Sequence, residues 1–494
     1  MKLSQLLKTL RVYQTTKDIN HVTVTGIEMD SRQVTHGHLF ICINGFTVDG
    51  HDYAKQAEEK GAAAIVADRP LDVSVPVILV RDTSRTMAKL ANAYYHNPTQ
   101  KFQLIGITGT NGKTSTSYLV EAIFKQHKDK TGLVGTIQMK IGDKEYQVKN
   151  TTPDSLFLQK HFAEMVNEGV DTAVMEVSSH ALDLGRVHGA DFDIAVFTNL
   201  SQDHLDYHKD MDDYLRAKSL LFAQLGNGYD ATKPKYGIVN RDDPYYEAFC
   251  NSTSQEVLTY SMDHKGDITA KDVKLSASGT TFTLCTPSGD KEITSPLIGK
   301  FSVYNMLAAA SAAWVAGVDL ETIQEALSTT KGVSGRFEPV LAGQEYGVIV
   351  DYAHTPDSLE NVLETIQSFA KKKIYVVVGC GGDRDRTKRP LMAKVAVNYA
   401  TEAIFTSDNP RSEDPESILR DMESGVEEGT FKTIVNRKEA IQYAIEQAKD
   451  GDVVLIAGKG HEPYQEINGV THHFDDREVA AECINDRTQR SYRD

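Results

Sequence analysis

Apolar segments that end in polar, glycine-rich turns recur along the chain, and they constrain its fold more than any other feature. In the last third they are YGVIVDYAH, IYVVVGCGG, EAIFTSDNPR and DVVLIAGKGHE, which begin at residues 346, 374, 402 and 452. Apolar runs that alternate with helical patterns are typical of parallel α/β sheets. Because ligands of such sheets bind beyond the carboxyl ends of the strands, we expect the functional residues at these turns.

The chain has 494 residues, which is too long for one hydrophobic core. Three successive series of strands and helices predict three domains. The first, residues 1–98, holds HLFICI, AAAIVA and the helical TMAKLANAYYHNP. The second, residues 99–334, holds the buried strands TAVMEVSS, IAVFTNL and KYGIVN, and a stretch over residues 268–297 whose period-two alternation predicts antiparallel strands. The third, residues 335–494, holds the four segments above, so the predicted fold class is α/β with three domains.

Charge and cysteine content narrow the possible partners. Lys and Arg number 53 against 69 acidic residues, for a net charge of −16, which argues against general binding to nucleic acid or anionic membranes. The five cysteines are scattered without a CxxC pair, which fits a reducing cytosol and gives no support for a zinc site. No apolar run resembles a signal peptide or approaches the roughly 18 residues of a membrane span. We therefore expect a soluble, cytoplasmic protein.

The segment LIGITGTNGKTSTSYLVEAIF predicts a phosphate-binding loop between a strand and a helix. Gly109 and Gly112 allow the backbone N–H groups to surround a phosphate chain, Lys113 would reach the terminal phosphates, and the Thr114 hydroxyl would bind Mg²⁺. The spacing departs from GxxxxGK[ST], because five residues separate Gly106 from Gly112. The alternative is an ordinary strand–turn–helix junction. Kinases, motors and switches share such a loop, so it indicates a nucleotide without naming a reaction.

Two further residues stand at strand ends. Glu176, in TAVMEVSSHALDLGR, could complete an Mg²⁺ shell, since Mg²⁺ prefers hard oxygen ligands, or it could cap the following helix. His204, in NLSQDHLDYH, is a candidate for a metal or nucleotide role, with a structural role as the alternative. Lys218, in YLRAKSLLF, has the spacing of a solvated helix lysine, and spacing alone gives no reason to choose it.

A set of motifs, in this order along the chain, resembles those of the Mur ligases: TGTNGKTS, EVSSHAL, NLSQDHLDYH, YLRAKSLLF, GRFE, DYAHTPDS, GCGGDRDRTKRP, SDNPR and GKGHE. The resemblance covers essentially the whole chain and is strongest for the members that add the third residue of the peptidoglycan peptide. It implies an N-terminal α/β domain that holds a UDP-sugar, a central P-loop ATPase domain with a mostly parallel sheet, and a C-terminal Rossmann-like domain that brings the amino acid.

The resemblance also implies roles for individual residues. Lys218 matches the family's carbamylated lysine: an ammonium would repel Mg²⁺, whereas a neutral amine that has taken up CO₂ becomes an anionic oxygen ligand. The implied catalytic residues are Lys113, Glu176, His204 and Lys218, and the implied metal ligands are Thr114, Glu176, His204 and carbamylated Lys218. The implied ATP contacts are Gly109, Thr110, Asn111, Gly112, Lys113, Thr114, Ser115, Asn305, Arg336 and Asp351. The UDP-N-acetylmuramoyl dipeptide would meet Ser31, Phe46, Thr47, Val48, Asn150, Thr151, Thr152, Ser178 and Arg186.

The turn SDNPR indicates which amino acid is added. In this family DNPR resembles the version that selects meso-diaminopimelate, whereas the lysine-adding members usually carry another residue in place of Arg411. Diaminopimelate has one carboxylate more than lysine, and an Arg fork matches a carboxylate in a bidentate way. The alternative is that Arg411 only pairs with Glu413 or Asp414. The implied diaminopimelate contacts are Arg384, Asp408, Asn409, Pro410, Arg411, Gly458 and Glu462.

The expected function is therefore ATP-dependent addition of meso-2,6-diaminopimelate to UDP-N-acetylmuramoyl-L-alanyl-D-glutamate, through an acyl-phosphate. The expected partners are these three small molecules, with Mg²⁺ as cofactor, no nucleic acid, no membrane, and a monomeric enzyme. Two roles are open for His354, namely proton removal from the attacking amine or a structural role. Folylpolyglutamate synthase, a rival with a TGTNGK-type loop, has no reason to carry DNPR or a UDP-binding domain. A P-loop switch or motor would leave the strand-end residues of the third domain unexplained.

Overall fold

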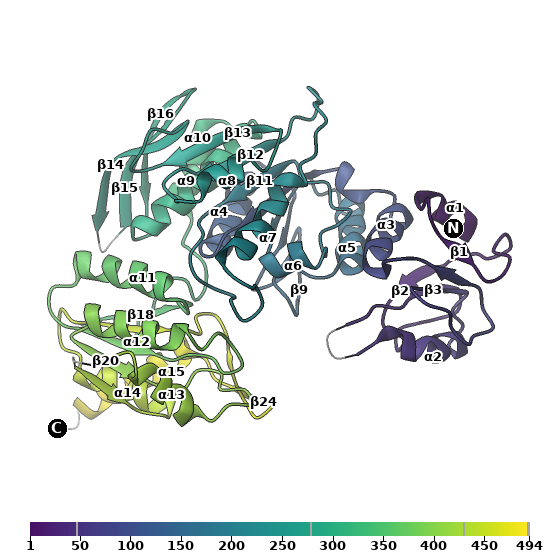
Figure 1. Cartoon of the computed structure of the whole chain (residues 1–494). Coiled ribbons are helices and arrows are strands. Elements are labelled where there is room, and N and C mark those ends of the chain that lie inside the picture. The colour runs from purple at the N-terminus through teal and green to yellow at the C-terminus, as the bar shows by residue number, and fades with distance from the viewer. Residues whose placement is uncertain (46–47, 277–278, 428–429, 492–494) are drawn as a thin grey trace.

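The computed structural model describes residues 1–45, 48–276, 279–427 and 430–491. The chain forms three lobes in sequence order, each built around its own sheet, with the central lobe between the other two (Figure 1). Helix α3 of the N-terminal lobe packs on α5 of the central lobe, and α11 of the C-terminal lobe faces the central lobe. In the described part of the chain, no helix is both long and apolar enough to cross a bilayer.

The N-terminal lobe contains a five-stranded sheet in the order β1-β5-β4-β3-β2, parallel except for β1. Its strands are β1 (Gln14–Thr15), β2 (Gly26–Glu28), β3 (His38–Ile41), β4 (Ala64–Ala67) and β5 (Val77–Leu79). Its helices are α1 (Leu3–Leu6), α2 (Ala54–Glu59) and α3 (Thr83–Tyr94). The strands predicted at HLFICI and AAAIVA and the helix that closes this series are confirmed.

The central sheet has eleven strands in the order β16-β15-β14-β13-β12-β11-β6-β10-β7-β8-β9. The strands from β7 to β14 in this order run parallel, and antiparallel hairpins extend both ends. The strands are β6 (Gln103–Thr108), β7 (Thr131–Val134), β8 (Met139–Ile141), β9 (Lys144–Tyr146), β10 (Thr172–Glu176), β11 (Ile194–Phe197), β12 (Tyr236–Asn240), β13 (Glu256–Ser261), β14 (Ile268–Ser276), β15 (Gly279–Thr286) and β16 (Gly289–Ser295). The antiparallel pairing predicted for residues 268–297 is thereby confirmed.

Helices cover both faces of the central sheet because its buried strands are apolar on both sides. One face carries α4 (Lys113–Gln126), α9 (Lys300–Val315) and α10 (Leu320–Thr329). The other carries α5 (Ser155–Asn167), α7 (Met211–Ala223) and α8 (Tyr246–Cys250), with the short α6 (Ser179–Asp183) against α7. This arrangement leaves the carboxyl ends of β6, β10, β11 and β12 at one edge of the sheet, where the chain enters its polar turns.

The C-terminal lobe has a six-stranded sheet in the order β17-β18-β22-β19-β20-β21, parallel except for β17. Its strands are β17 (Glu338–Pro339), β18 (Gly347–Asp351), β19 (Ile374–Val378), β20 (Glu402–Phe405), β21 (Phe431–Thr433) and β22 (Val453–Ala457), with a separate hairpin of β23 (Tyr464–Ile467) and β24 (Val470–His473). One face carries α11 (Pro356–Phe369), α12 (Lys388–Tyr399) and α13 (Pro415–Glu423), and the other α14 (Arg437–Gln447) and α15 (Asp476–Ser491). The four predicted strands are confirmed, and each ends in its predicted turn. The boundaries at residues 98 and 334 stay predictions.

Candidate active site

The loop between β6 and α4 has the backbone of a phosphate-binding loop. Gly109 and Gly112 have φ values of 148° and 84°, in the region that favours glycine. A Cβ at Gly109 would overlap Thr198 Oγ1, and one at Gly112 would overlap Asn305 Oδ1. Side chains are therefore excluded at both positions, which leaves the N–H groups at the start of α4 free to face an anion.

Lys113, the first residue of α4, folds back over this loop. Its Nζ donates hydrogen bonds to the carbonyl oxygens of Gly109 (2.9 Å) and Thr110 (2.7 Å). Burial lowers the pKa of Lys113, and the nearby Arg336 adds to this effect. The amine thus lies directly over the loop, within reach of phosphates bound there.

Glu176 ends β10 inside the sheet edge and is fully buried. Its Oε2 accepts hydrogen bonds from the hydroxyls of Thr114 (2.8 Å) and Thr136 (2.9 Å), and its Oε1 accepts one from the Thr136 amide (2.9 Å). It does not cap the following helix, because Ser178 performs that role for α6. The carboxylate therefore faces the Thr114 hydroxyl at the start of α4.

The oxygen atoms of Glu176 and Thr114 fit a magnesium ion. The partners of Glu176 within hydrogen-bond distance are hydroxyl and amide donors, and Lys113 interacts with it electrostatically from farther away. A divalent cation beside Glu176 and Thr114 would give this buried carboxylate a direct charged partner. No group of three His, Cys, Asp or Glu side chains with metal-binding geometry occurs in the described residues. Mg²⁺ does not need such a group, since it usually keeps several waters and combines one or two carboxylates with phosphate oxygens.

Lys218, on α7, is buried rather than solvated, with an exposed fraction of 1%. Its Nζ donates to the carbonyl oxygen of Gly109 (2.7 Å) and lies 4.5 Å from the centre of the Tyr214 ring. Burial lowers the pKa of Lys218 well below its usual value, and Lys113 adds to the effect. A neutral amine is the form that reacts with CO₂, so the environment suits the implied carbamate.

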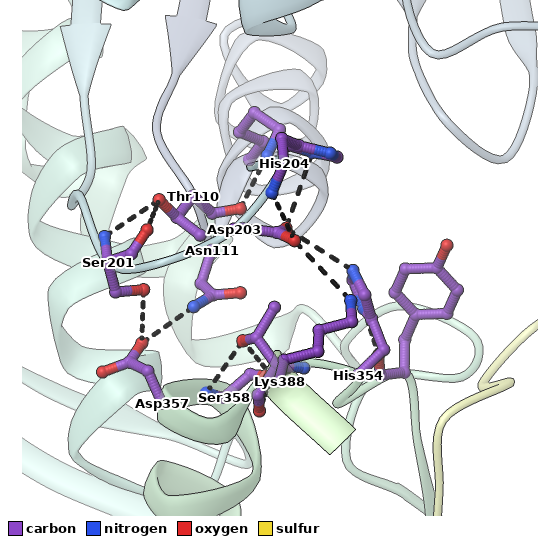
Figure 2. A network of polar contacts seen from close by, with 12 residues as sticks. Thr110, Asn111, Ser201, Asp203, His204, His354, Asp357, Ser358 and Lys388 are labelled. Atoms are coloured by element: carbon purple, nitrogen blue, oxygen red, sulfur yellow. Dashed lines mark hydrogen bonds and ion pairs between the residues drawn. The ribbon is translucent and has the colours of Figure 1, made fainter. Parts of the chain in front are cut away.

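His204 and Asp203 follow β11, and Figure 2 shows Asp203 at the centre of a polar network. His204 Nε2 lies 3.5 Å from Asp203 Oδ2, and burial lowers the pKa of His204 to about 3. His354 Nε2 lies 3.8 Å from the same oxygen, while its Nδ1 contacts the Tyr352 carbonyl oxygen at 2.9 Å. Burial lowers the pKa of His354 to about 4, with Lys388 contributing. Both imidazoles are therefore neutral near pH 7.

Two adjoining cavities, each of about 340 Å³, meet at four residues: Asn111, Gly112, Arg336 and Tyr352. Cavity A lies beside the phosphate loop, between α9 and the start of α11, and it is lined by the predicted ATP contacts Ser115, Asn305 and Asp351. Burial raises the pKa of Asp351, whose Oδ1 accepts a hydrogen bond from the Ala353 amide (2.7 Å).

Cavity B brings together predicted residues from three substrate sets. It is lined by Thr110, Lys113, Thr114, Glu176, His204 and Lys218, by the predicted dipeptide contacts Asn150, Thr151, Thr152, Ser178 and Arg186, and by Arg384 of the C-terminal lobe. Arg336 Nη2 also reaches the Thr114 hydroxyl (3.3 Å), from the segment that leads into the C-terminal lobe. Phosphate loop, dipeptide residues and C-terminal lobe therefore share one space.

The dipeptide residues in cavity B are tied to one another around Thr152. The Thr152 hydroxyl donates to the carbonyl oxygen of Glu176 (2.8 Å) and accepts from the Ser178 amide (3.0 Å), and Arg186 Nη1 donates to the Thr152 carbonyl oxygen (3.2 Å). The residues predicted for the UDP end lie in the N-terminal lobe instead. There Ser31 is buried and donates to Gln56 Oε1 (2.6 Å), Val48 is exposed, and Phe46 and Thr47 lie outside the described residues.

The predicted diaminopimelate residues gather at the carboxyl ends of β19, β20 and β22. Arg411 has a left-handed φ of 52°, and its Nη1 donates to the Gly382 carbonyl oxygen (2.8 Å). Its neighbouring carboxylate is Glu466, 3.5 Å from Nε, rather than Glu413, which pairs with Arg389. A Cβ built on Gly381 would lie 2.9 Å from Arg411 Nη1 and 3.8 Å from Arg384 Cγ, so the two arginines approach the same glycine.

The rest of this group forms a buried network behind Arg411. Asn409 Nδ2 donates to Glu462 Oε2 (3.0 Å), and Asn409 Oδ1 accepts from Lys459 Nζ (3.0 Å). Pro410 and Asp408 are buried, and a Cβ on Gly458 would lie 2.7 Å from Asp408 Oδ2. Burial and the adjacent Asp408 raise the pKa of Glu462. Its Oε1 lies 3.5 Å from the hydroxyl of Tyr352, a residue that lines both cavity A and cavity B.

Several residues of the two cavities carry no prediction from the sequence. They include Thr136, His180, Asp242, Tyr304, Tyr352 and Asp357. Tyr352 and Asp357 belong to the DYAHTPDS motif that follows a strand, so their position at a strand end was the available signal. Thr136 carries no such signal, because it enters the site through its hydrogen bonds to Glu176 and Thr151, which depend on the folded structure.

Comparisons with known proteins show the family of the chain. Family models described as "Mur ligase family, catalytic domain", "Mur ligase middle domain" and "Mur ligase, glutamate ligase domain" match residues 23–95, 107–313 and 335–460. A Bacillus cereus protein named UDP-N-acetylmuramoyl-L-alanyl-D-glutamate–2,6-diaminopimelate ligase is 58% identical over 99% of both chains. The chain belongs to the Mur ligase family. A Listeria monocytogenes protein of the same name is 52% identical over 98% of this Mur ligase and 99% of its own chain.

Solved structures place the Mur ligase among homologues of the same three-lobed fold. One described as a UDP-N-acetylmuramoyl-L-alanyl-D-glutamate–2,6-diaminopimelate ligase has a TM-score of 0.70 at 34% identity, over 98% of this chain and 99% of its own. A MurF ligase from Thermotoga maritima in complex with ADP has a TM-score of 0.64 at 18% identity, over 95% and 97% of the two chains. At that identity the second likeness concerns the fold alone.

Proposed function

We propose that this Mur ligase joins meso-2,6-diaminopimelate to UDP-N-acetylmuramoyl-L-alanyl-D-glutamate, with conversion of ATP to ADP and phosphate, in peptidoglycan precursor synthesis. The observation that carries the proposal is cavity B. There the phosphate-loop lysine, a buried carboxylate that accepts from hydroxyl and amide donors, and an arginine of the C-terminal lobe face one space. The named relatives support the choice of substrates, because all of those cited carry this activity in their names at 52–58% identity.

In the first step, the terminal carboxylate of the D-glutamyl residue takes the γ-phosphoryl group of ATP, which gives an acyl-phosphate and ADP. Lys113 and the N–H groups at the start of α4 would hold the phosphates, and Arg336 would add positive charge. Thr114, Glu176, His204 and Lys218 as its carbamate are the proposed Mg²⁺ ligands. Bound there, Mg²⁺ neutralises the charge on the phosphate oxygens. The residues around Thr152 would hold the peptide carboxylate beside the loop.

In the second step, the amine of diaminopimelate attacks the acyl carbon, the bond from that carbon to the phosphate oxygen breaks, and the departing phosphate takes up the proton that the amine loses. No enzyme nucleophile is needed, because the acyl-phosphate is already activated. His354 has a structural role in this proposal, since one ring nitrogen contacts a backbone carbonyl and the other faces Asp203. Exclusion of water from cavity B by the C-terminal lobe protects the intermediate.

Selection of the amino acid is assigned to Arg411 and Arg384, with Asp408, Asn409, Gly458 and Glu462 for the ammonium end. Bound lysine would offer no second carboxylate to the partly buried Arg411. A buried polar group that lacks its hydrogen-bond partner costs about 1–3 kcal/mol of binding free energy. The alternative pairing with Glu413 or Asp414 loses support, because these residues pair with Arg389 and Arg420.

We place the reaction in the cytoplasm and propose a monomer. The five cysteines are free thiols, which is typical of a reducing compartment, and a single chain supplies every lobe that the proposed reaction needs.

ADP release measured with purified substrates tests the proposal. Turnover should need both the UDP-N-acetylmuramoyl dipeptide and meso-diaminopimelate, with lysine a poor replacement. Turnover that requires a folate instead, or that proceeds with ATP alone, would contradict it. Trapping of an acyl-phosphate in a single turnover without diaminopimelate would separate ligation from a nucleotide switch.

A further inference from the structure

A short segment after β11 touches the phosphate loop on one side and the C-terminal lobe on the other (Figure 2). We call residues 199–204 the bridging loop. On the phosphate-loop side, the Asn199 carbonyl oxygen accepts from the Thr110 amide (2.8 Å), and Asn199 Oδ1 accepts from the Asn111 amide (2.9 Å). The Ser201 amide also donates to Thr110 Oγ1 (3.0 Å). These bonds fix the bridging loop to the phosphate loop.

The first contact with the C-terminal lobe is made by Asp357, in the first turn of α11. Its Oδ2 accepts hydrogen bonds from Asn111 Nδ2 (2.8 Å) and Ser201 Oγ (3.2 Å), so one carboxylate oxygen joins α11 to both loops. A carboxylate is favoured at this position because the N-terminal turn of a helix carries partial positive charge. The bond is therefore compatible with a stable α11.

The second contact is made by Lys388, the first residue of α12. Its Nζ lies 3.6 Å from Asp203 Oδ1 in the bridging loop, and the two side chains are only 9% and 6% exposed. A buried charge without its partner is costly, so this pair favours the orientation in which both members meet.

Lys388 shares its segment with a residue of the reaction cavity. Arg384 lines cavity B and stands four residues before Lys388, on the chain between β19 and α12. Among the described residues, Lys388 itself lines neither cavity A nor cavity B. The contact with Asp203 therefore fixes where Arg384 lies relative to Lys113 and Glu176, without placing Lys388 on the substrate.

We propose that Asp357 and Lys388 are positioning residues that hold the C-terminal lobe on the bridging loop, so that the amino acid reaches the acyl-phosphate. The inference deepens the proposed function and rests on it. Its physical basis is that reacting groups must be aligned closely, and a displacement of about 1 Å can cost roughly 100-fold in rate.

The test compares Lys388→Met with Arg386→Met. Arg386 is exposed and pairs with Asp421 inside the C-terminal lobe (2.9 Å), so its loss removes a nearby cation without touching the central lobe. We expect Lys388→Met to lower kcat by roughly 100-fold and to raise the KM for diaminopimelate, with unchanged ATP binding. Lys388→Arg should recover most of the activity, and Arg386→Met should resemble the wild type. Equal kinetics for Lys388→Met and Arg386→Met, at equal thermal stability, would overturn the assignment of Lys388.

Asp357→Ala is an independent test of the positioning role, and it still tests that role if Lys388→Met fails to fold. Its matched control is Glu416→Ala, because Glu416 follows a proline in the first turn of α13 in the same way, but is exposed and forms no polar contact with the described part of the central lobe. Asp357→Ala should lower kcat and raise the KM for diaminopimelate, and Glu416→Ala should change neither. If Asp357→Ala matches its control, the proposal is wrong.

Small-angle scattering separates this inference from the proposed function. With ADP and MgCl₂ as the probe, Lys388→Met should have a larger radius of gyration than the wild type and Arg386→Met, whatever the amino acid substrate is. Equal radii for all three proteins would reject the positioning role. A wild-type enzyme that shows no diaminopimelate-dependent ADP release, but does show this difference in radius, would reject the proposed substrate and leave the positioning role standing.

Discussion

At the scale of single residues, Arg411 presents its guanidinium at the edge of the C-terminal sheet, held by the Gly382 carbonyl oxygen and beside Glu466. A charge-assisted hydrogen bond contributes about 1.5–3 kcal/mol, so Arg411→Ala should raise the KM for diaminopimelate by roughly 10- to 150-fold. The dissociation constant of ATP should not change, because Arg411 lines neither cavity A nor cavity B among the described residues.

Steady-state kinetics measure the KM for diaminopimelate. Calorimetry with a non-hydrolysable ATP analogue measures nucleotide binding. Arg420→Ala is the control, because Arg420 is exposed and pairs with Asp414, the N-cap of its own helix, and with Glu416 in the first turn. An unchanged KM for diaminopimelate in Arg411→Ala would remove Arg411 from the specificity argument.

Lys218 leads to a prediction about stability. Its pKa is lowered in the folded protein by burial and then by Lys113, so the unfolded chain binds more protons between the folded pKa and the ordinary lysine pKa of 10.5. Over that range stability rises with pH, and the cost of keeping the amine neutral grows as pH falls. In CO₂-depleted buffer, Lys218→Met should therefore raise the Tm while it abolishes ligation, with a larger gain at pH 6.5 than at pH 9.

Thermal melts at the two pH values measure this difference. Lys160→Met, on the exposed side of α5, is the control and should shift the Tm little at either pH. A gain for Lys218→Met that is independent of pH would mean that packing, rather than the titration of the amine, causes it.

At the scale of elements, the phosphate loop depends on two glycines whose neighbours exclude a side chain. Gly112→Ala would place a Cβ against Asn305 Oδ1 in a backbone with φ of 84°. A left-handed conformation costs an ordinary residue about 1–2 kcal/mol. Gly317→Ala has the same backbone cost at φ 92°, but its Cβ meets nothing within 4 Å. We expect both variants to lose similar stability and only Gly112→Ala to lose ADP release and the rise in Tm on ATP addition. A Gly317→Ala enzyme that is equally inactive would mean that strain alone, without the clash, causes the loss.

The strands and their turns could be predicted from the sequence because their signal is local. Buried parallel strands are continuous apolar runs, and β14 to β16 alternate between buried and more exposed residues over part of their length, as at Ile268–Ala270 and Ile293–Ser295. Lys218 could not be found this way. Nothing in the spacing of α7 distinguishes it from a solvated lysine, and its burial arises only when α7 packs against the phosphate loop. Asp357 and Lys388 were missed for a related reason, since their partners lie in another lobe and depend on how the lobes are oriented.

At the scale of the whole molecule, the two interfaces of the central lobe differ in chemistry. The C-terminal lobe meets the central lobe through polar contacts such as Asn111–Asp357 and Asp203–Lys388, which water can replace, and through one apolar contact in which Phe301 of α9 packs against the C-terminal core. The N-terminal lobe meets it through apolar packing of α3 on α5, where Leu156 belongs to the N-terminal core. We therefore expect the C-terminal lobe to move during the reaction cycle, and the N-terminal lobe to stay docked.

Leu156→Ala tests the docked interface. Loss of a buried leucine costs about 2–5 kcal/mol, and here the loss falls on the contact between the two lobes. The KM for the UDP-linked substrate should rise, because its two ends are expected to bind on different lobes, whereas the KM for ATP should stay the same. Leu158→Ala is the matched control, since Leu158 lies two residues away on α5 but packs in the core of the central lobe. It should lose comparable stability and leave the KM for the UDP-linked substrate unchanged at a temperature where both variants are folded. If the two variants raise that KM equally, the effect comes from general destabilisation of α5, and the prediction for the docked interface is wrong.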